Sequence, residues 1–303
     1  MKNPKIGFIG GGNMGGAMIE ALWRAQSDEA GAVRSSAEDE QKIGGSEAHE
    51  AENLAQTDKI PSPRECEKKT KFEILACARS KNEALRQRFG VKIAASETNL
   101  AREADAVVLA TKPANYEAIL RLIAPELAGK ILLLLAPGFD IKRARQITGD
   151  GVYIARAMPN IAACIGASAT ALCFDAEFSE PKKETVREII AKIGKIYEID
   201  EAGFAAFTGI AGSLPAYACA FFEAAADAGV RGGLPRQLCY DAVAAAVEGT
   251  ARLIQSGKHP AALKDEVCSP AGTTIEGLAA LEKGGFRGAL MQAVAACIAK
   301  ARG

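Results

Sequence analysis

The stretch KIGFIGGGNMGGAM, residues 5–18, decides the fold of this chain. Its short apolar run predicts a buried strand, and the residues after the glycines have the apolar spacing of a helix. Gly10, Gly12 and Gly15 stand in the G-x-G-x-x-G spacing. In this spacing the first glycine permits a tight turn, the second lets a pyrophosphate approach, and the third allows close helix packing. The order of strand, glycine turn and helix favours a dinucleotide-binding loop over a plain structural turn.

Strand and helix patterns continue to alternate along the first two hundred residues. Near-continuous apolar strands that alternate with helices are typical of a parallel sheet covered on both faces, with right-handed crossovers. We therefore predict an α/β fold in which residues 1–200 form a doubly wound Rossmann domain. The further strand patterns lie at 72–78, 91–95, 105–111, 130–136, 152–158, 169–174 and 195–199.

Two segments depart from this alternation. Residues 27–71 contain no aromatic residue and many charged and small polar ones, which predicts a mobile surface insertion. After residue 200 only helical patterns with Gly or Pro stops remain, so residues 201–303 are predicted to form an all-α domain. That domain is rich in alanine and other apolar residues, which predicts a surface that a partner covers.

The charge balance excludes several classes of partner. Lys and Arg equal Asp and Glu at 37 each, which gives no electrostatic argument for nucleic acid or an anionic membrane. No unbroken apolar run approaches the roughly 18–20 residues of a membrane span, and no signal-peptide pattern opens the chain. The eight cysteines show no C-x-x-C motif and no histidine at metal-ligand spacing. We expect a cytoplasmic protein with reduced thiols and no metal.

The residues after the second strand pattern indicate which dinucleotide binds. Arg79, Ser80 and Lys81 follow that strand directly. A carboxylate there would accept a hydrogen bond from the free 2′-hydroxyl of NAD, whereas cations and a hydroxyl suit a 2′-phosphate. NADPH is therefore the predicted cofactor, with NADH as the alternative. The competing interpretation is that Arg79 and Lys81 are solvated loop charges.

Two later strand ends carry further candidates. Thr111, Lys112 and Pro113 follow the fourth strand pattern, where open α/β sheets bind ligands. Lys112 is either a functional cation or a structural one, and Pro113 suits the first residue of a helix. Asn160 ends another strand, either as a turn residue or as one that faces the cofactor. The predicted cofactor set also includes two residues of the glycine loop, Asn13 and Met14.

A second unusual helix start is VCSPAGTTIEGL, residues 267–278. Ser269, Pro270 and Thr273 can cap the helix that follows, but capping needs only one hydroxyl. A helix N-terminus with free N–H groups and several hydroxyls is suited to bind a carboxylate. A dinucleotide loop together with a carboxylate site predicts a reductase of a small carboxylic acid.

At these segments the chain resembles the pyrroline-5-carboxylate reductase family over nearly its whole length apart from the insertion. The resemblance implies a Rossmann domain with an all-α dimerisation domain. It also implies NAD(P)H reduction of the cyclic imine 1-pyrroline-5-carboxylate to L-proline by homodimers that assemble into decamers. The matching segments are KIGFIGGGNMG, ATKP, AMPN, AGSLPAY, EAAADAGVRGGLPR, SGKHPAALKDEVCSPAGTT and ALEKGGFR.

The resemblance also implies roles for individual residues. Thr274 and Lys112 are the catalytic candidates, while bound water and protonation in solvent are alternatives to Thr274 as the proton source. A Rossmann domain of the dimer is expected to complete each substrate site. The implied substrate-binding residues are Ser213, Ser269, Gly272, Thr273 and Thr274.

Several positions depart from the family pattern, among them residues 135–138, which differ from the usual Ala-Ala-Gly loop. Ala211 removes a usual hydroxyl, Leu214 adds bulk, and Ala271 replaces a glycine, so that a Cβ limits its backbone. Glu97 stands where an Asn that faces the cofactor ribose is usual, and an acid near phosphates is unfavourable. These changes leave two alternatives open: a reductase of another cyclic imine or small oxoacid, and a non-catalytic NADP(H)-binding regulatory protein.

Overall fold

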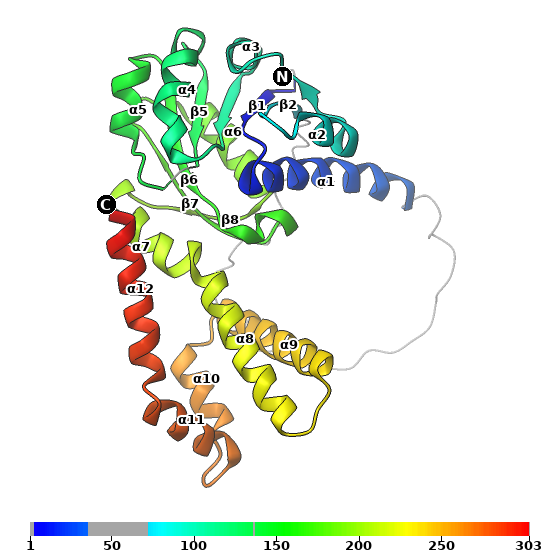
Figure 1. Ribbon diagram of the computed structural model, residues 1–303, viewed down its shortest axis with the longest axis vertical. Coiled ribbons are helices and arrows are strands. Elements are labelled where there is room, and N and C mark those ends of the chain that lie inside the picture. Colours follow the sequence, from blue (N-terminus) through cyan, green and yellow to red (C-terminus); the bar gives the residue numbers. More distant parts are fainter. Residues whose placement is uncertain (1–2, 36–71, 136, 303) are drawn as a thin grey trace, which may run out of the picture. The chain divides into compact units, whose positions relative to one another are not determined.

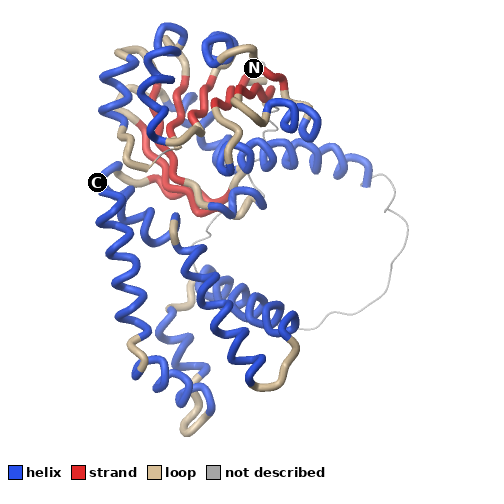
Figure 2. The backbone as a smooth tube through the Cα atoms, viewed as in Figure 1, coloured by secondary structure: helices blue, strands red, loops and turns tan. Residues whose placement is uncertain are grey.

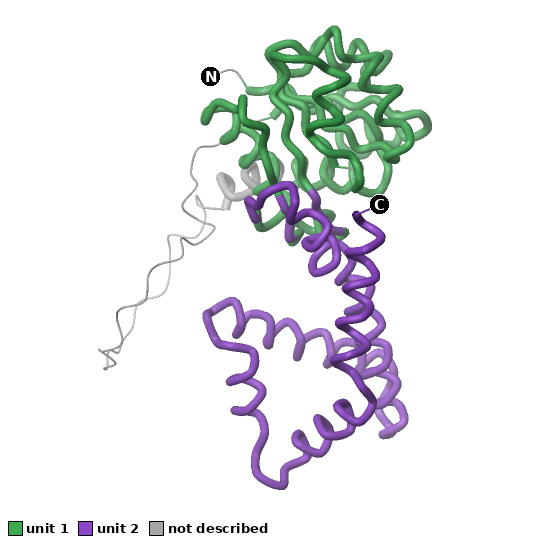
Figure 3. The backbone as a smooth tube through the Cα atoms, turned by 90° about the vertical axis from the view of Figure 1, so that its left-hand side faces the viewer, with its two compact units in different colours: residues 1–157, 161–168, 172–196 green, residues 158–160, 169–171, 197–303 purple. Residues whose placement is uncertain are grey.

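The computed structural model describes residues 3–35, 72–135 and 137–302. Its contacts divide the chain into two compact units (Figure 3). The sequence predicted a division between residues 200 and 201, and the contacts divide the chain between residues 196 and 197. Unit 1 also excludes residues 158–160 and 169–171, which belong to unit 2.

An eight-stranded sheet forms the framework of the α/β part (Figures 1 and 2). Its strand order is β3-β2-β1-β4-β5-β6-β7-β8, and the neighbours from β3 to β6 pair in parallel. This order contains the 3-2-1-4-5-6 arrangement of Rossmann domains, so the predicted doubly wound fold is confirmed. The strands are β1 Lys5–Ile9, β2 Glu73–Cys77, β3 Lys92–Ile93, β4 Ala106–Leu109, β5 Ile131–Leu134, β6 Tyr153–Met158, β7 Ser168–Phe174 and β8 Gly194–Glu198.

Helices cover both faces of the sheet because successive strand side chains enter two separate cores. In β4, Val108 belongs to the core that contains residues of α1 and α6, and Val107 belongs to the core that contains residues of α3 and α4. The helices of this part are α1 Asn13–Ser35, α2 Asn82–Phe89, α3 Glu97–Glu103, α4 Tyr116–Ile123, α5 Ile141–Thr148 and α6 Glu180–Ala191, with the short 3-10 helices η1 Pro113–Asn115, η2 Ala124–Glu126 and η3 Ile161–Ile165.

The first helix runs further than the sequence predicted. The sequence predicted that the helix ends at residue 26 and that an insertion begins at residue 27, but α1 continues to Ser35. Polar composition reduces what a segment can bury, yet Ala, Glu and Arg keep a high helix propensity. The remainder of the predicted insertion, residues 36–71, lies outside the described residues.

From residue 201 to residue 302 the structure contains helices and turns and no strand, so the predicted all-α domain is confirmed. Large apolar side chains on these helices are exposed, including Phe221, Leu290 and Met291. The helices are η4 Glu201–Gly203, α7 Phe204–Phe207, η5 Thr208–Gly212, α8 Leu214–Arg231, α9 Arg236–Gln255, α10 Pro260–Val267, α11 Thr273–Lys283 and α12 Phe286–Arg302.

One helical run in the described part of the chain, Glu201–Arg231, is long and apolar enough to cross a membrane by length and composition. An 18-residue window within this run has a mean hydropathy of 1.4, and 17% of that window is buried. The sequence prediction excluded a span on unbroken apolar length, which is a stricter criterion than mean hydropathy. The π-helical turn η5 interrupts the run. An exposed apolar surface of this kind is also what an oligomer interface requires.

Candidate functional site

The glycine loop lies at the point where the strand order reverses. β1 pairs with β2 on one side and with β4 on the other, and open α/β sheets bind ligands outside the carboxyl ends of strands at such a point. Main-chain hydrogen bonds hold the three strand ends together. Gly10 N donates to Cys77 O at 2.9 Å, and Ala110 N donates to Ile9 O at 2.9 Å. The predicted cofactor residues that follow these strands therefore share one edge of the sheet.

Each of the three glycines in the loop is suited to its position for a different reason. Gly10 has φ +105°, which L side chains rarely adopt, and a Cβ there would lie 2.7 Å from Ala110 O. A Cβ on Gly15 would lie 2.2 Å from Gly10 O, so this glycine lets α1 approach the loop. A Cβ on Gly12 would meet nothing within 4 Å. Of the three, Gly12 alone faces open space that a pyrophosphate can enter.

A pocket of about 380 Å³ opens at this edge of the sheet. Lys81, Glu97 and Asn115 line it as well. The sequence placed Lys81 after the second strand and, by the family resemblance, Glu97 near the cofactor ribose, so Asn115 is the residue of the three that was not predicted. Glu97 and Asn115 begin and end short helices after β3 and β4, so their approach depends on strand order, which no local motif encodes. The predicted residues that the pocket brings together are Gly10, Gly12, Arg79, Ser80, Thr111 and Lys112.

The charges in this pocket suit a phosphate-bearing ligand. Arg79, Lys81 and Lys112 supply three cations against the single carboxylate of Glu97, and none of the four makes an ion pair with another described residue. The N–H groups in the first turn of α1 add a positive potential beside Gly12. The pKa of the Cys77 thiol, in the same pocket, is raised by burial and then by the charge of Glu97. Cys77 is therefore a neutral side chain in this site.

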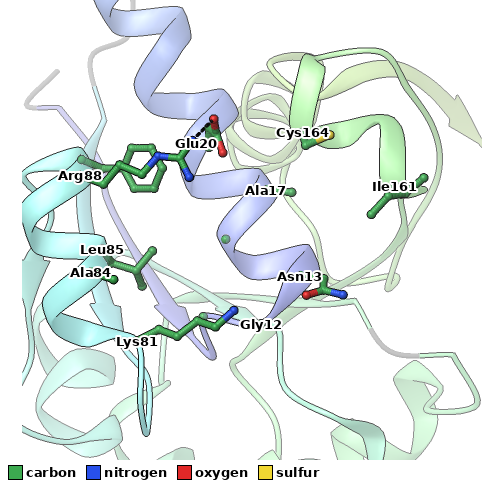
Figure 4. Close-up of a pocket in the computed structure, with 13 residues that line it drawn as sticks. Gly12, Asn13, Ala17, Glu20, Lys81, Ala84, Leu85, Arg88, Ile161 and Cys164 are labelled. Atoms are coloured by element: carbon green, nitrogen blue, oxygen red, sulfur yellow. Dashed lines mark hydrogen bonds and ion pairs between the residues drawn. The ribbon is translucent and has the colours of Figure 1, made fainter. Parts of the chain in front are cut away.

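A second pocket of about 460 Å³ lies on the other side of the loop, between α1, α2 and η3 (Figure 4). Asn13 lines this pocket, and Lys81 lines both pockets and extends toward the start of α1. An ion pair of 2.8 Å between Arg88 and Glu20 joins α2 to α1 here. The structure therefore places Asn13 beside the second pocket and not in the first.

The remaining predicted cofactor residues lie outside both pockets. Met14 packs against a core of the sheet, and Gly15 lies beneath the loop. Pro113 is exposed as the first residue of η1, as its helix-start interpretation predicted. The Nδ2 of Asn160 donates to Ala211 O at 3.1 Å, which ties the end of β6 to η5.

The second predicted site begins with a tight turn in unit 2. Gly272 N donates to Ser269 O at 3.0 Å, with Pro270 and Ala271 at the centre of the turn. Ala271 has φ +56°, as the third residue of a type II turn requires. Gly272 is the N-cap of α11, and no side chain accepts a hydrogen bond there, so the predicted capping by Ser269 or Thr273 is wrong.

The reason is the direction of the Ser269 side chain. A Cβ on Gly272 would lie 2.2 Å from Ser269 Oγ, so this hydroxyl packs over the glycine instead of the helix N–H groups. The first-turn N–H groups of α11 therefore have neither a helical carbonyl nor a side-chain cap. Thr273 and Thr274, the first two residues of the helix, are exposed beside them. This is the local chemistry that a carboxylate requires.

Ser213 lies away from this turn. It follows η5, a π-helical turn of a kind frequent at functional sites, and its Oγ lies 3.1 Å from Sγ of Cys297. Cys297 is about 16 Å along α12 from Phe286, which follows α11 directly. Figure 1 shows α7 and α11 at opposite ends of α12. Within one chain Ser213 is therefore not brought together with the other predicted substrate residues, which share the turn before α11.

The two catalytic candidates belong to different units. Lys112 lines the pocket at the glycine loop in unit 1, and Thr274 is the second residue of α11 in unit 2. The structure therefore groups Lys112 with the cofactor candidates.

A Rossmann sheet whose loop admits a pyrophosphate defines the first unit as a dinucleotide-binding domain. Residues 54–137 match the family model described as NADP oxidoreductase, coenzyme F420-dependent. Residues 201–303 match the model for pyrroline-5-carboxylate reductase dimerisation.

Curated relatives and solved structures extend this likeness over the whole chain. A pyrroline-5-carboxylate reductase of Glycine max is 39% identical over 216 residues, 71% of this chain and 78% of the relative. That of Escherichia coli is 33% identical over 298 residues, 98% of this chain and 96% of the relative. The structure of Plasmodium falciparum pyrroline carboxylate reductase with NADP bound covers 100% of this chain and 98% of its own, with 27% identity and a TM-score of 0.76. The chain belongs to the pyrroline-5-carboxylate reductase family.

Proposed function

We propose that this protein reduces 1-pyrroline-5-carboxylate to L-proline with NADPH, and with NADH as the alternative cofactor. The observation that carries the proposal is the family membership, because a relative of that name aligns with 98% of the chain. The pocket at the switch point supports the cofactor part of the proposal independently, since it combines an open glycine with unpaired cations.

The residues of the pocket fit NADPH. Gly12 leaves room for the pyrophosphate beside the first turn of α1, and Arg79 with Lys81 would hold the 2′-phosphate. Bound there, the nicotinamide supplies the hydride for the imine carbon. A closely packed Gly15 keeps the start of α1 against the loop, so that its N–H groups stay aimed at the phosphates.

The start of α11 would hold the substrate carboxylate. Its uncapped N–H groups and the hydroxyls of Thr273 and Thr274 are donors for both carboxylate oxygens. A carboxylate fixed in this way orients the ring of the imine toward the nicotinamide. Because a protonated imine is already electrophilic, such positioning would supply most of the catalysis. The Thr274 hydroxyl is our candidate proton donor, with bound water and protonation before binding as alternatives.

The substrate site would be completed by a second copy of the chain. In one chain Ser213 contacts Cys297 in the later turns of α12, whereas α11 precedes the first turn of α12 (Figure 1), so the two would contribute to one site across a dimer. The exposed apolar residues of α8 and α12 suit the interface of such a dimer better than lipid, because the match to a dimerisation domain covers them. We further propose that the dimers assemble into decamers in the cytoplasm, without a membrane or nucleic-acid partner.

The first test is the loss of NADPH absorbance with 1-pyrroline-5-carboxylate, beside parallel assays with NADH and with a six-membered cyclic imine carboxylate. Turnover of the five-membered imine supports the proposal. Turnover of the six-membered imine alone would assign another imine reductase, an outcome favoured by the exposed Leu214 that follows Ser213. Tight NADPH binding without turnover of either imine would indicate a regulatory protein.

A further inference from the structure

The pocket at the glycine loop contains a carboxylate that the usual sequence rule does not find. In NAD-binding Rossmann domains an acid that binds the ribose 2′-hydroxyl follows the second strand of the fold. Here that position holds Arg79, Ser80 and Lys81, yet Glu97 lines the same pocket. Its carboxylate comes from the start of α3, the helix after β3.

Sheet topology brings Glu97 to this place. β3 pairs in parallel with β2, with Ile93 opposite Ala76, and Ala94 N donates to Ala76 O at 3.0 Å. The segments that follow the two strands therefore leave the sheet side by side. Ser96 then caps α3 by accepting from Asn99 N at 3.1 Å, which fixes the helix so that it begins with Glu97.

Two observations describe the carboxylate: it has no partner among the described residues, and its charge lies close to the end of β2. Glu97 makes no hydrogen bond or ion pair with another described residue, although Arg79 and Lys81 line the same pocket. Its charge also helps to raise the pKa of Cys77, the last residue of β2, after the larger effect of burial. The carboxylate thus acts electrostatically at the end of the second strand, where the ribose-binding acid of an NAD enzyme acts.

We infer that Glu97 is the acceptor for the free 2′-hydroxyl of NADH and sets the ratio between NADH and NADPH binding. The inference rests on the proposed dinucleotide function and deepens it. Arg79 and Lys81 favour the 2′-phosphate of NADPH, whereas Glu97 repels that phosphate and accepts from the hydroxyl that replaces it. The pocket therefore contains one recognition element for each cofactor, so the protein uses both.

The test is the affinity of the purified protein for NADH and NADPH, measured by the fluorescence of the bound nucleotide without substrate. Glu97→Gln should weaken NADH binding by about tenfold, because it removes a charge-assisted hydrogen bond. The same variant should strengthen NADPH binding by about threefold, because it removes a repulsive charge. Arg79→Ala should shift the ratio of the two affinities in the opposite direction, because it should weaken NADPH binding and leave NADH binding unchanged.

Glu103→Gln is the matched control, since Glu103 is at the other end of α3 and pairs with Lys5 and Lys92. It should leave both affinities unchanged. Equal effects of Glu97→Gln on the two nucleotides, or no effect, would overturn the role of Glu97 while NADPH turnover by the wild type still supported the proposed function. Failure of the wild-type protein to bind either nucleotide would overturn both.

Discussion

The glycine loop of unit 1 and the turn before α11 in unit 2 are both helix starts prepared for an anion, but they differ in what supports them. The loop is fixed by main-chain hydrogen bonds to neighbouring strands, and Gly10 occupies its position of positive φ. The turn is held by one such bond, and Ala271 occupies its position of positive φ. Most of the predicted residues of the first site line one pocket in unit 1, whereas we propose that a second copy of the chain completes the second site.

The difference follows from where each unit buries its apolar surface. The strands beneath the glycine loop are inside two hydrophobic cores, with Ile6 and Phe8 fully buried. In unit 2 an apolar pocket of about 510 Å³ between α8, α11 and α12 is lined by Phe221 and Leu290, which are 43% and 38% exposed. Exposed apolar area contributes roughly 25 cal/mol per Å² once a partner covers it. We therefore expect the second site to depend on assembly in a way that the first does not.

Preventing assembly is the strongest test of the proposed difference between the two sites. Leu290→Asp places a negative charge in the apolar pocket. A second copy of the chain would bury that carboxylate without an opposite charge to pair with it. We expect a monomer whose turnover falls by about a hundredfold or more, because a buried unpaired charge costs several kcal/mol. NADPH binding should remain, since the glycine loop belongs to unit 1. Light scattering and nucleotide fluorescence measure the two effects.

Leu122→Asp is the control for this prediction. Leu122 is a leucine of α4 in unit 1 that is 54% exposed, so a charge there should alter neither oligomeric state nor turnover. A fully active Leu290→Asp monomer would contradict the proposed dimeric substrate site.

A pair of glycine substitutions separates packing from ligand approach at the loop. Gly15→Ala should lower the free energy of unfolding by about 2–3 kcal/mol, because the new methyl group meets a main-chain oxygen that cannot move aside. Gly12→Ala should change stability by less than about 0.5 kcal/mol and weaken NADPH binding by about tenfold, because its methyl group enters the pyrophosphate path. Denaturant unfolding and nucleotide titration give both values. Equal loss of stability in the two variants would refute the separate roles.

The corresponding test in unit 2 is Thr274→Ala. Loss of one hydroxyl from the start of α11 should raise the KM for 1-pyrroline-5-carboxylate by about tenfold and leave the KM for NADPH unchanged. Thr250→Ala is the control, because the Thr250 hydroxyl donates to Ala246 O within α9 and should affect neither constant. An equal rise in both Michaelis constants would place Thr274 outside the carboxylate site. A fall in kcat beside the rise in the KM for the imine would support its further role as proton donor.

The sequence predicted the sheet and the glycine loop well because their signals are local. Buried parallel strands form continuous apolar runs, and the three glycines are explained by contacts within one strand, turn and helix. The end of α2 has a local signal of the same kind, since Gly90 ends that helix in the left-handed conformation.

Other features were beyond local patterns. Glu97 reaches the pocket because β3 lies beside β2, so no motif after β2 encodes it, and only the family resemblance placed it near the cofactor ribose. The end of α1 was placed too early, because polar composition limits burial but does not stop a helix. The predicted cap of α11 was wrong because the Ser269 hydroxyl packs over Gly272, which is itself the N-cap residue. The sequence offered several hydroxyls near this helix start and did not show which way each would point. These features depend on contacts between residues far apart in the sequence or on packing, which local sequence patterns do not determine.

The smallest predicted effect concerns the turn itself. Ala271 has a positive φ that costs an L-residue roughly 1–2 kcal/mol. Ala271→Gly should remove that strain, while the added freedom of the unfolded chain costs roughly 0.5–1 kcal/mol. The net expectation is a gain of about 0.5–1 kcal/mol in the free energy of unfolding of the assembled protein. Ala271→Val should lower it, because a β-branched residue tolerates this conformation less well than alanine. If both substitutions destabilised the protein, contacts of the Ala271 methyl group would outweigh its backbone strain, and the turn would be better supported than the comparison with Gly10 implies.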